Sequence, residues 1–229
     1  MAIEHECDYS LRVLQELNAH LYRVSDDRKY GLADIISYLH RHVTQILKNV
    51  RKNNHTYTKY HLCSAFSWTM AYANRMHIDV PQEMWNCFPG VCPYCIEKPC
   101  VCKQRGSTRS RPRDFNPHSW TKTINDWQVL LAEIYQENTL LNSAMHLAEE
   151  IGELNEASRN YRHATDEPRF NKVIEEVVDV FANLLAVATC MNFSFGTILV
   201  KYFSRGNCPK CKKSPCECPY VELDEPIEF

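Results

Sequence analysis

The sequence predicts an all-α protein built from two similar helical halves. Apolar residues recur at helical spacing along most of the chain, and only 6 of the 229 residues are glycine, which favours helices. Two clusters of four cysteines lie far apart, and each follows a series of predicted helices. These observations divide the chain into a first half (residues 1–102), a linker (residues 103–119) and a second half (residues 120–229).

The first half carries four predicted helices. Leucine, isoleucine and valine at helical spacing define the first two, aromatic residues are frequent in the third, and Pro81 lies near the start of a short fourth. Asp26 and Asp27 predict a break after the first helix. The predicted helices span residues 8–24, 32–50 and 58–76, and the fourth ends before Pro89.

The linker is basic. Five Lys or Arg residues alternate with Gly, Ser and Pro between Lys103 and His118, which favours a solvated linker over a phosphate-binding segment. A helix over residues 124–141 then opens the second half, and Pro168 separates the two helices that follow.

Each cysteine cluster has the spacing Cys-x-x-Cys-x4-Cys-x-Cys. Four thiolates are the ligand set of a structural zinc ion, so we expect two zinc ions per chain. The short Cys-x-Cys arm is less typical of zinc, which leaves an iron–sulfur cluster as the alternative. Neither cluster carries the basic and aromatic surplus of a nucleic-acid-binding module. The predicted ligands are Cys92, Cys95, Cys100 and Cys102 in the first cluster, and Cys208, Cys211, Cys216 and Cys218 in the second.

The two clusters match position for position at an offset of 116 residues, and the match includes their glycines and prolines. Chance does not produce such a match, so we interpret the chain as an internal duplication.

Two pairs of carboxylates in the second half are spaced to share a helix face. Glu150 and Glu153 are three residues apart, as are Glu176 and Asp179, so each pair lies about 60° apart around its helix axis. The helix of the second pair is apolar nearly all round and should be buried. If the two helices pack antiparallel, four carboxylates converge, repel one another and lose hydration. A hard divalent cation, Mg²⁺ or Mn²⁺, would relieve both costs.

The paired motif resembles the MazG family of nucleoside triphosphate pyrophosphohydrolases. The resemblance covers roughly residues 124–205 and rests on Glu149-Glu150-Ile151-Gly152-Glu153 and Glu176-Val177-Val178-Asp179. It implies a tandem all-α bundle and a Mg²⁺-dependent enzyme that converts an NTP or dNTP to NMP or dNMP plus pyrophosphate. The cysteine clusters are an elaboration that the family does not generally need.

Further residues are candidates for binding or catalysis. Glu149 is either a base that acts beside the ligands or a solvated charge, and Asn183 either contacts the nucleotide or orients a carboxylate. Lys201 and Arg205 follow the buried helix and either hold the phosphate tail or are ordinary surface charges.

The first half has lost all four cation ligands. The offset of 116 places Tyr60, Cys63 and Ser67 opposite Glu176, Asp179 and Asn183. An offset one residue shorter places Ile35 and Tyr38 opposite Glu150 and Glu153. We therefore expect a degenerate half that packs on the active half as an internal pseudo-dimer, with a homodimer as a further level of association.

Composition narrows the function classes. A formal net charge of −2 argues against a protein that coats nucleic acid. The acidic residues between Met1 and Glu6 do not form a signal peptide, so we expect a cytoplasmic protein without disulfides. The nearly uncharged stretch Val177–Val200 is interrupted by Asp179 and Gly196, which favours a buried helix over a membrane span. Besides the enzyme, an NTP·Mg²⁺ sensor with little turnover and a zinc-stabilised adaptor fit the sequence.

Overall fold

A computed structural model describes residues 8–102, 122–136, 138–203 and 206–219. The predicted linker 103–119 therefore lies outside the described residues. Within those ranges the secondary structure is helical, and it contains no strand. The helices are α1 (Leu11–Lys29), α2 (Leu32–Arg51), α3 (His55–Arg75), α4 (Val80–Cys87), α6 (Ile124–Ile134), α7 (Leu140–His163), α8 (Glu167–Cys190) and α9 (Phe195–Tyr202).

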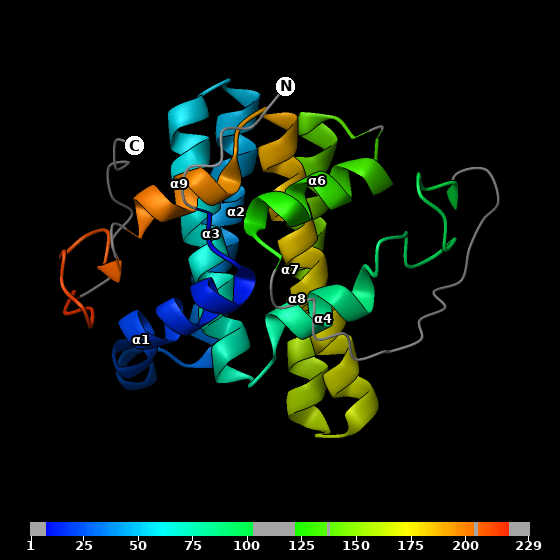
Figure 1. Cartoon of the computed structure of the whole chain (residues 1–229). Coiled ribbons are helices and arrows are strands. Elements are labelled where there is room, and N and C mark those ends of the chain that lie inside the picture. Colours follow the sequence, from blue (N-terminus) through cyan, green and yellow to red (C-terminus); the bar gives the residue numbers. More distant parts are fainter. Residues whose placement is uncertain (1–7, 103–121, 137, 204–205, 220–229) are drawn as a thin grey trace.

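Two antiparallel helix pairs form the centre of the molecule (Figure 1). Helices α2 and α3 pack as one pair, α7 and α8 as the other, and the pairs join where α2 meets α7 and α3 meets α8. One apolar cluster runs through both pairs, and α8 contributes to it along its whole length. The predicted all-α class is confirmed.

Most helices begin at a side-chain cap that the sequence supplies. Ser10, Asn54 and Asp79 accept a backbone N–H of the first turn of α1, α3 and α4. Thr123, Thr139, Asp166 and Ser194 do the same for α6, α7, α8 and α9. Such caps contribute about 1 kcal/mol each.

Two predicted boundaries were wrong. Helix α1 continues through Asp26 and Asp27 to Lys29, because Asp27 forms an ion pair with Arg75 at 2.9 Å and lies 4.0 Å from Arg23. The predicted helix 124–141 is interrupted after Ile134, since Thr139 caps a new helix.

The two halves repeat the same geometry in detail. Helices α4 and α9 each have eight residues and start 115 residues apart. The residues before them agree too, because Met76 and Met191 end α3 and α8 with nearly the same backbone angles. His77 and Asn192 follow with φ of 57° and 56°. The loops that carry the clustered cysteines (the cysteine loops) keep the offset of 116, since Gly90 and Gly206 both have positive φ.

This geometry corrects the predicted register of the third helix. An offset of 115 through α3 and α8 places His61, Ser64 and Trp68 opposite Glu176, Asp179 and Asn183, instead of Tyr60, Cys63 and Ser67. It is the same offset that Ile35 and Tyr38 require. An alignment of the two halves by their cysteine motifs is one residue out of register in the helices. The reason is that the second half has one more residue between the short helix and the cysteine loop.

Each half ties its cysteine loop to the first helix of the other half. The Cys100 N–H donates to the Ile134 carbonyl of α6 at 2.8 Å, and the Cys216 N–H donates to the Leu21 carbonyl of α1 at 2.8 Å. Tyr135 donates its hydroxyl hydrogen to Cys92 Sγ at 3.9 Å, and Tyr22 likewise hydrogen-bonds Cys208. The two loops consequently lie on opposite sides of the bundle (Figure 1).

None of the described helices combines the length and the hydropathy that a transmembrane segment requires.

A buried histidine pair occupies the core of the first half. His42 and His61 are 3% and 4% exposed, and their Nδ1 atoms are 3.1 Å apart. Burial and the neighbouring His61 lower the pKa of His42 to about 3. Burial and Arg41 lower the pKa of His61 to about 4. Both rings are therefore neutral at neutral pH, so an uncharged imidazole stands where the second half has Glu176.

The histidine pair predicts a loss of stability in acid. The unfolded chain protonates both rings below their ordinary pKa of about 6.5, whereas the folded protein excludes those protons to lower pH. The stabilising contribution is complete above the unfolded pKa and is lost progressively as pH falls from there toward the folded pKa values of about 4 and about 3. Between about pH 7.5 and about pH 5.5, we expect the free energy of unfolding to fall about 2 kcal/mol more than in His42→Asn/His61→Asn. Equal slopes in urea denaturation of the two proteins would contradict this assignment.

Candidate functional site

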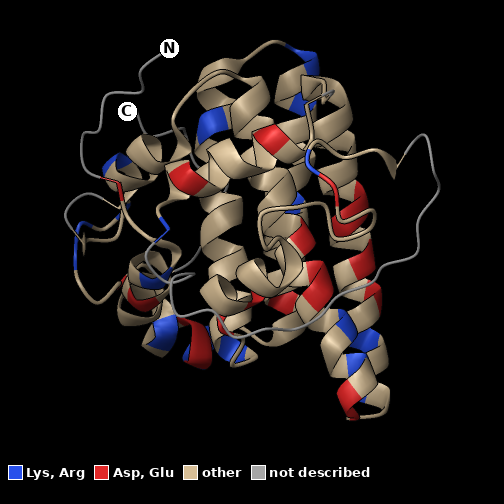
Figure 2. Cartoon of the chain, turned by 45° about the vertical axis from the view of Figure 1, so that its right-hand side comes forward, with Lys and Arg blue, Asp and Glu red and all other residues tan. Residues whose placement is uncertain are grey.

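Three carboxylates from two helices converge in the second half. Glu150 and Glu153 of α7 and Glu176 of α8 each offer an oxygen, and these oxygens lie within 4.8 Å of one another. Helix packing buries Glu176 to 1% exposure, whereas Glu153 is exposed. Acidic residues follow this stretch of the two long helices (Figure 2). The predicted antiparallel packing therefore brings three of the four predicted ligands together.

The electrostatics of the triplet are unfavourable without a cation. Burial, reinforced by the charges of Asp179, Glu176 and Glu153, raises the pKa of Glu150 to about 8. Burial also raises the pKa of Glu176, although Lys172 opposes the shift through an ion pair with Glu176 Oε1. Glu176 Oε2 is buried and has no hydrogen-bond partner among the described residues. A buried, orphaned carboxylate oxygen beside two further carboxylates fits a hard divalent cation.

Asp179 and Asn183 lie next to the triplet. Asp179 is not part of the close set of three, but among neighbouring charges its own has the largest effect on Glu150. Asn183 Nδ2 donates to the Asp179 backbone carbonyl at 3.0 Å and to Glu150 Oε1 at 3.4 Å. The amide therefore contacts the Glu150 carboxylate, and the two alternative roles of Asn183 remain predictions.

A cavity of about 500 Å³ opens beside these residues. Glu150, Asp179 and Asn183 line it on the carboxylate side. Two aromatic residues of the first half, Phe88 and Tyr94, form part of its wall, so both halves build the cavity. The remaining lining comes from α6, α7, α8 and the loop after α6: Leu131, Ala132, Tyr135, Gln136, Asn138, His146, Ala182, Ala186, Thr189 and Cys190.

Two predicted site residues are not brought to this cavity, and a third lies outside the described residues. Glu149 is exposed and lies 2.9 Å from His146 Nδ1, outside the triplet. Lys201 is exposed on α9 and does not line the cavity, and Arg205 lies outside the described residues. Their predicted roles remain predictions.

Sequence reasoning also missed residues that the structure brings to the site. Lys172 stands one helical turn before Glu176, a spacing at which an ion pair is expected, so it could have been found. Tyr94 and Phe88 could not have been found in this way, because only the packing of the two halves brings them to the cavity.

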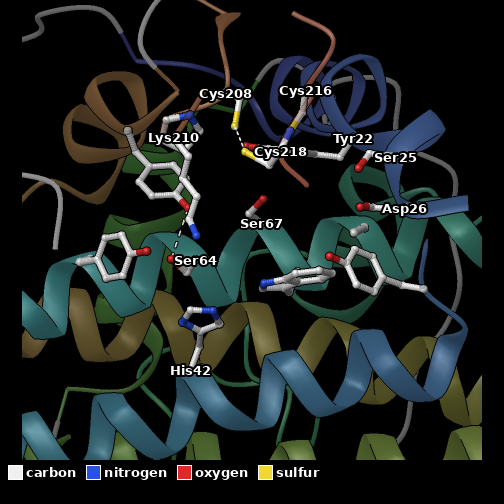
Figure 3. Close-up of a pocket in the computed structure, with 16 residues that line it drawn as sticks. Tyr22, Ser25, Asp26, His42, Ser64, Ser67, Cys208, Lys210, Cys216 and Cys218 are labelled. Carbon is white, nitrogen blue, oxygen red and sulfur yellow. Dashed lines mark hydrogen bonds between the residues drawn. The ribbon is translucent and has the colours of Figure 1, made fainter. Parts of the chain in front are cut away.

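The first half has a smaller cavity at the equivalent position. Its volume is about 80 Å³, and Tyr22, Ser64, Trp68 and Lys210 stand where the larger cavity has Tyr135, Asp179, Asn183 and Tyr94. Lys210 reaches toward Ser64 and His42 (Figure 3). Tyr38 stacks on Trp68 with ring centroids 4.8 Å apart, so aromatic rings lie where the second half has Glu153 and Asn183.

The eight clustered cysteines form two compact thiol groups. In each group the four sulfurs lie within 4.8 Å of one another. The Sγ–Sγ distances are 3.6 Å for Cys92–Cys102 and 4.0 Å for Cys95–Cys100. The equivalent pairs Cys208–Cys218 and Cys211–Cys216 are 3.8 and 4.0 Å apart.

These distances fit one tetrahedral ion per group. A Zn–S bond of about 2.3 Å in tetrahedral geometry separates the sulfurs by about 3.8 Å. Burial acts to raise the pKa of Cys95, but N–H donors at Val101 and Glu97, together with the thiols of Cys102 and Cys92, lower it to about 6. Burial raises the pKa of the neighbouring Cys100 to about 12, so these groups share their protons when no ion is bound. An iron–sulfur cluster distributes its thiolates over several iron atoms, which fits less well. Each group could therefore bind zinc.

Comparison with known proteins leaves the fold and the site to be interpreted on their own. No protein-family model, curated protein or solved structure matches the chain.

The thiol groups predict a metal content. Protein purified without chelator should contain about two zinc ions per chain by elemental analysis, one for each group of four thiolates. Replacing Cys95 and Cys100 with serine should remove about one ion, and the matched change at Cys211 and Cys216 should remove the other. Iron in place of zinc, or a chain without metal, would contradict this interpretation.

Proposed function

We propose that the chain is a Mg²⁺-dependent nucleotide pyrophosphohydrolase that splits an NTP or dNTP into NMP or dNMP and pyrophosphate. One observation carries the proposal: Glu150, Glu153 and Glu176 converge beside a cavity of about 500 Å³. Small-molecule sites usually enclose about 300–1,000 Å³. The resemblance to the MazG family supplies the reaction.

Glu150, Glu153 and Glu176 would hold Mg²⁺ or Mn²⁺, with Asp179 beside them as the fourth carboxylate. The bound ion would neutralise charge on the phosphate oxygens and lower the pKa of an attacking water. Asn183 holds Glu150 in position through its side-chain amide. Leu131, Ala182 and Ala186 give the cavity an apolar wall beside the carboxylates.

We also propose that the two halves are tandem MazG-like bundles and that the first is a degenerate copy. The matched helix ends, and the reciprocal bonds from Cys100 and Cys216, support a pseudo-dimer within one chain. Ile35, Tyr38, His61 and Ser64 replace the four carboxylates in the first half, so that half needs no cation. Zinc in the cysteine loops would stabilise the contact between the halves.

Substitution of the buried carboxylates tests the proposed function. Glu150→Gln should reduce pyrophosphate release from an NTP by about 100-fold or more, since it removes a ligand of the ion that activates water. The same variant should unfold at an equal or higher temperature in EDTA, because it removes a desolvated, repelled carboxylate. Glu156→Gln, on an exposed turn of the same helix, is the matched control and should retain full activity.

The assay should use a panel of NTPs and dNTPs with Mg²⁺ and then with Mn²⁺. Glu149→Gln in the same panel separates a base from a solvated charge. The substitution should lower kcat only if Glu149 acts as a base. Full activity of Glu150→Gln would contradict the proposed site. Binding of NTP·Mg²⁺ without pyrophosphate release by the wild-type chain would instead favour the sensor.

A further inference from the structure

The wall that the first half contributes to the cavity has no assigned role. We propose that Tyr94, at the tip of the first cysteine loop, binds the nucleobase of the substrate by stacking. The half without cation ligands would then determine nucleotide affinity in the half that has them. This inference rests on the proposed function, because it assumes a nucleotide in the cavity.

The loop presents Tyr94 at a turn closed by backbone bonds. The Cys92 N–H donates to the Glu97 carbonyl at 3.0 Å, and the Ile96 N–H donates to the Cys92 carbonyl at 2.9 Å. Tyr94 lies between these paired residues, lines the cavity and keeps 39% of its surface exposed. The loop therefore fixes the position of an aromatic ring at the cavity surface.

The second half holds this loop at a fixed distance from the carboxylates. Lys98 Nζ donates to Glu133 Oε2 of α6 at 2.7 Å, and the Cys100 N–H donates to the Ile134 carbonyl. The neighbouring Tyr135 also donates to Cys92 Sγ. These three bonds attach the loop to the end of α6, which lines the cavity, so Tyr94 is a pre-positioned side chain.

The chemistry of the described lining favours a stacking contact. Glu150 and Asp179 make the cavity acidic, and none of its described lining residues is Lys or Arg. Apart from the cation, the described walls supply no charge attraction for a triphosphate. A stacking contact with the base would add to the affinity that the cation gives. Base–aromatic stacking contributes about 1–3 kcal/mol per base.

Tyr94 is the lining aromatic best placed for such stacking. Phe88 is 2% exposed and belongs to the core, and Tyr135 is half-buried with its hydroxyl bonded to Cys92. Tyr94 is the exposed one.

The equivalent loop of the second half indicates that the tip residue is not required for the loop to fold. Lys210 occupies the matching position, and the backbone bonds from Cys208 and Lys212 repeat those of the first loop at 3.0 and 2.9 Å. The fold of the loop therefore does not dictate an aromatic residue at its tip, and Lys210→Ala is a matched control that faces the smaller cavity.

The experiment compares an NTP with inorganic tripolyphosphate, which has the phosphates but no base. We expect Tyr94→Ala to raise KM for NTP about 10-fold, with kcat nearly unchanged, in line with the loss of one stacked base. Its inhibition constant for tripolyphosphate should stay the same. Tyr94→Phe should restore KM because it keeps the ring, and Lys210→Ala should leave KM unchanged. Zinc content should be equal in all variants, which reports an intact loop.

Two outcomes would overturn the inference: an unchanged KM in Tyr94→Ala, or an equal loss of affinity for NTP and tripolyphosphate, which would show a structural role. If the wild-type chain releases no pyrophosphate, the proposed function fails separately. Calorimetric titration of NTP·Mg²⁺ and tripolyphosphate·Mg²⁺ into wild type and Tyr94→Ala then decides the role of Tyr94 by the same criterion.

Discussion

Burial of carboxylates between apolar helices is the constraint on which this structure depends. Glu150 and Glu176 lose hydration and repel each other, and burial raises the pKa of both. The protein offsets part of this cost with Lys172, but one oxygen of Glu176 remains without a hydrogen-bond partner among the described residues. Removing one partner of a buried charged group usually costs several kcal/mol. An arrangement that keeps such a cost in the core is typical of a functional site, where stability is given up for chemistry.

The first half resolves the same constraint in a different way. At the equivalent positions it has Ile35, Tyr38, His61 and Ser64, and its paired histidines stay neutral because burial lowers their pKa. Aromatic rings reduce the equivalent cavity to about 80 Å³, against about 500 Å³ in the second half. One geometry therefore yields a well-packed core in one copy and an open acidic cavity in the other. The packed copy still contributes, because its cysteine loop forms a wall of the open cavity.

The sequence predicted the helical class, most helix positions and three of the residues that converge. These features depend on local periodicity and on spacing along one helix, which a sequence displays directly. It predicted the third helix of the repeat one residue out of register, because a single extra residue before Gly206 is invisible when the cysteine motifs set the alignment. It also missed Tyr94 and Lys172. Tyr94 reaches the cavity only through contacts between the halves, such as the bond from Cys100 to Ile134, and no local pattern encodes those.

The second half should bind a divalent cation, and the first half should bind none. Anomalous diffraction from crystals of the protein soaked in Mn²⁺ tests this difference, because the method locates the ion without assuming any activity. We expect a strong peak among Glu150, Glu153 and Glu176, and no peak beside His61 in the other half. A peak at both positions, or no peak at the carboxylates at a Mn²⁺ concentration that supports nucleotide binding, would contradict it.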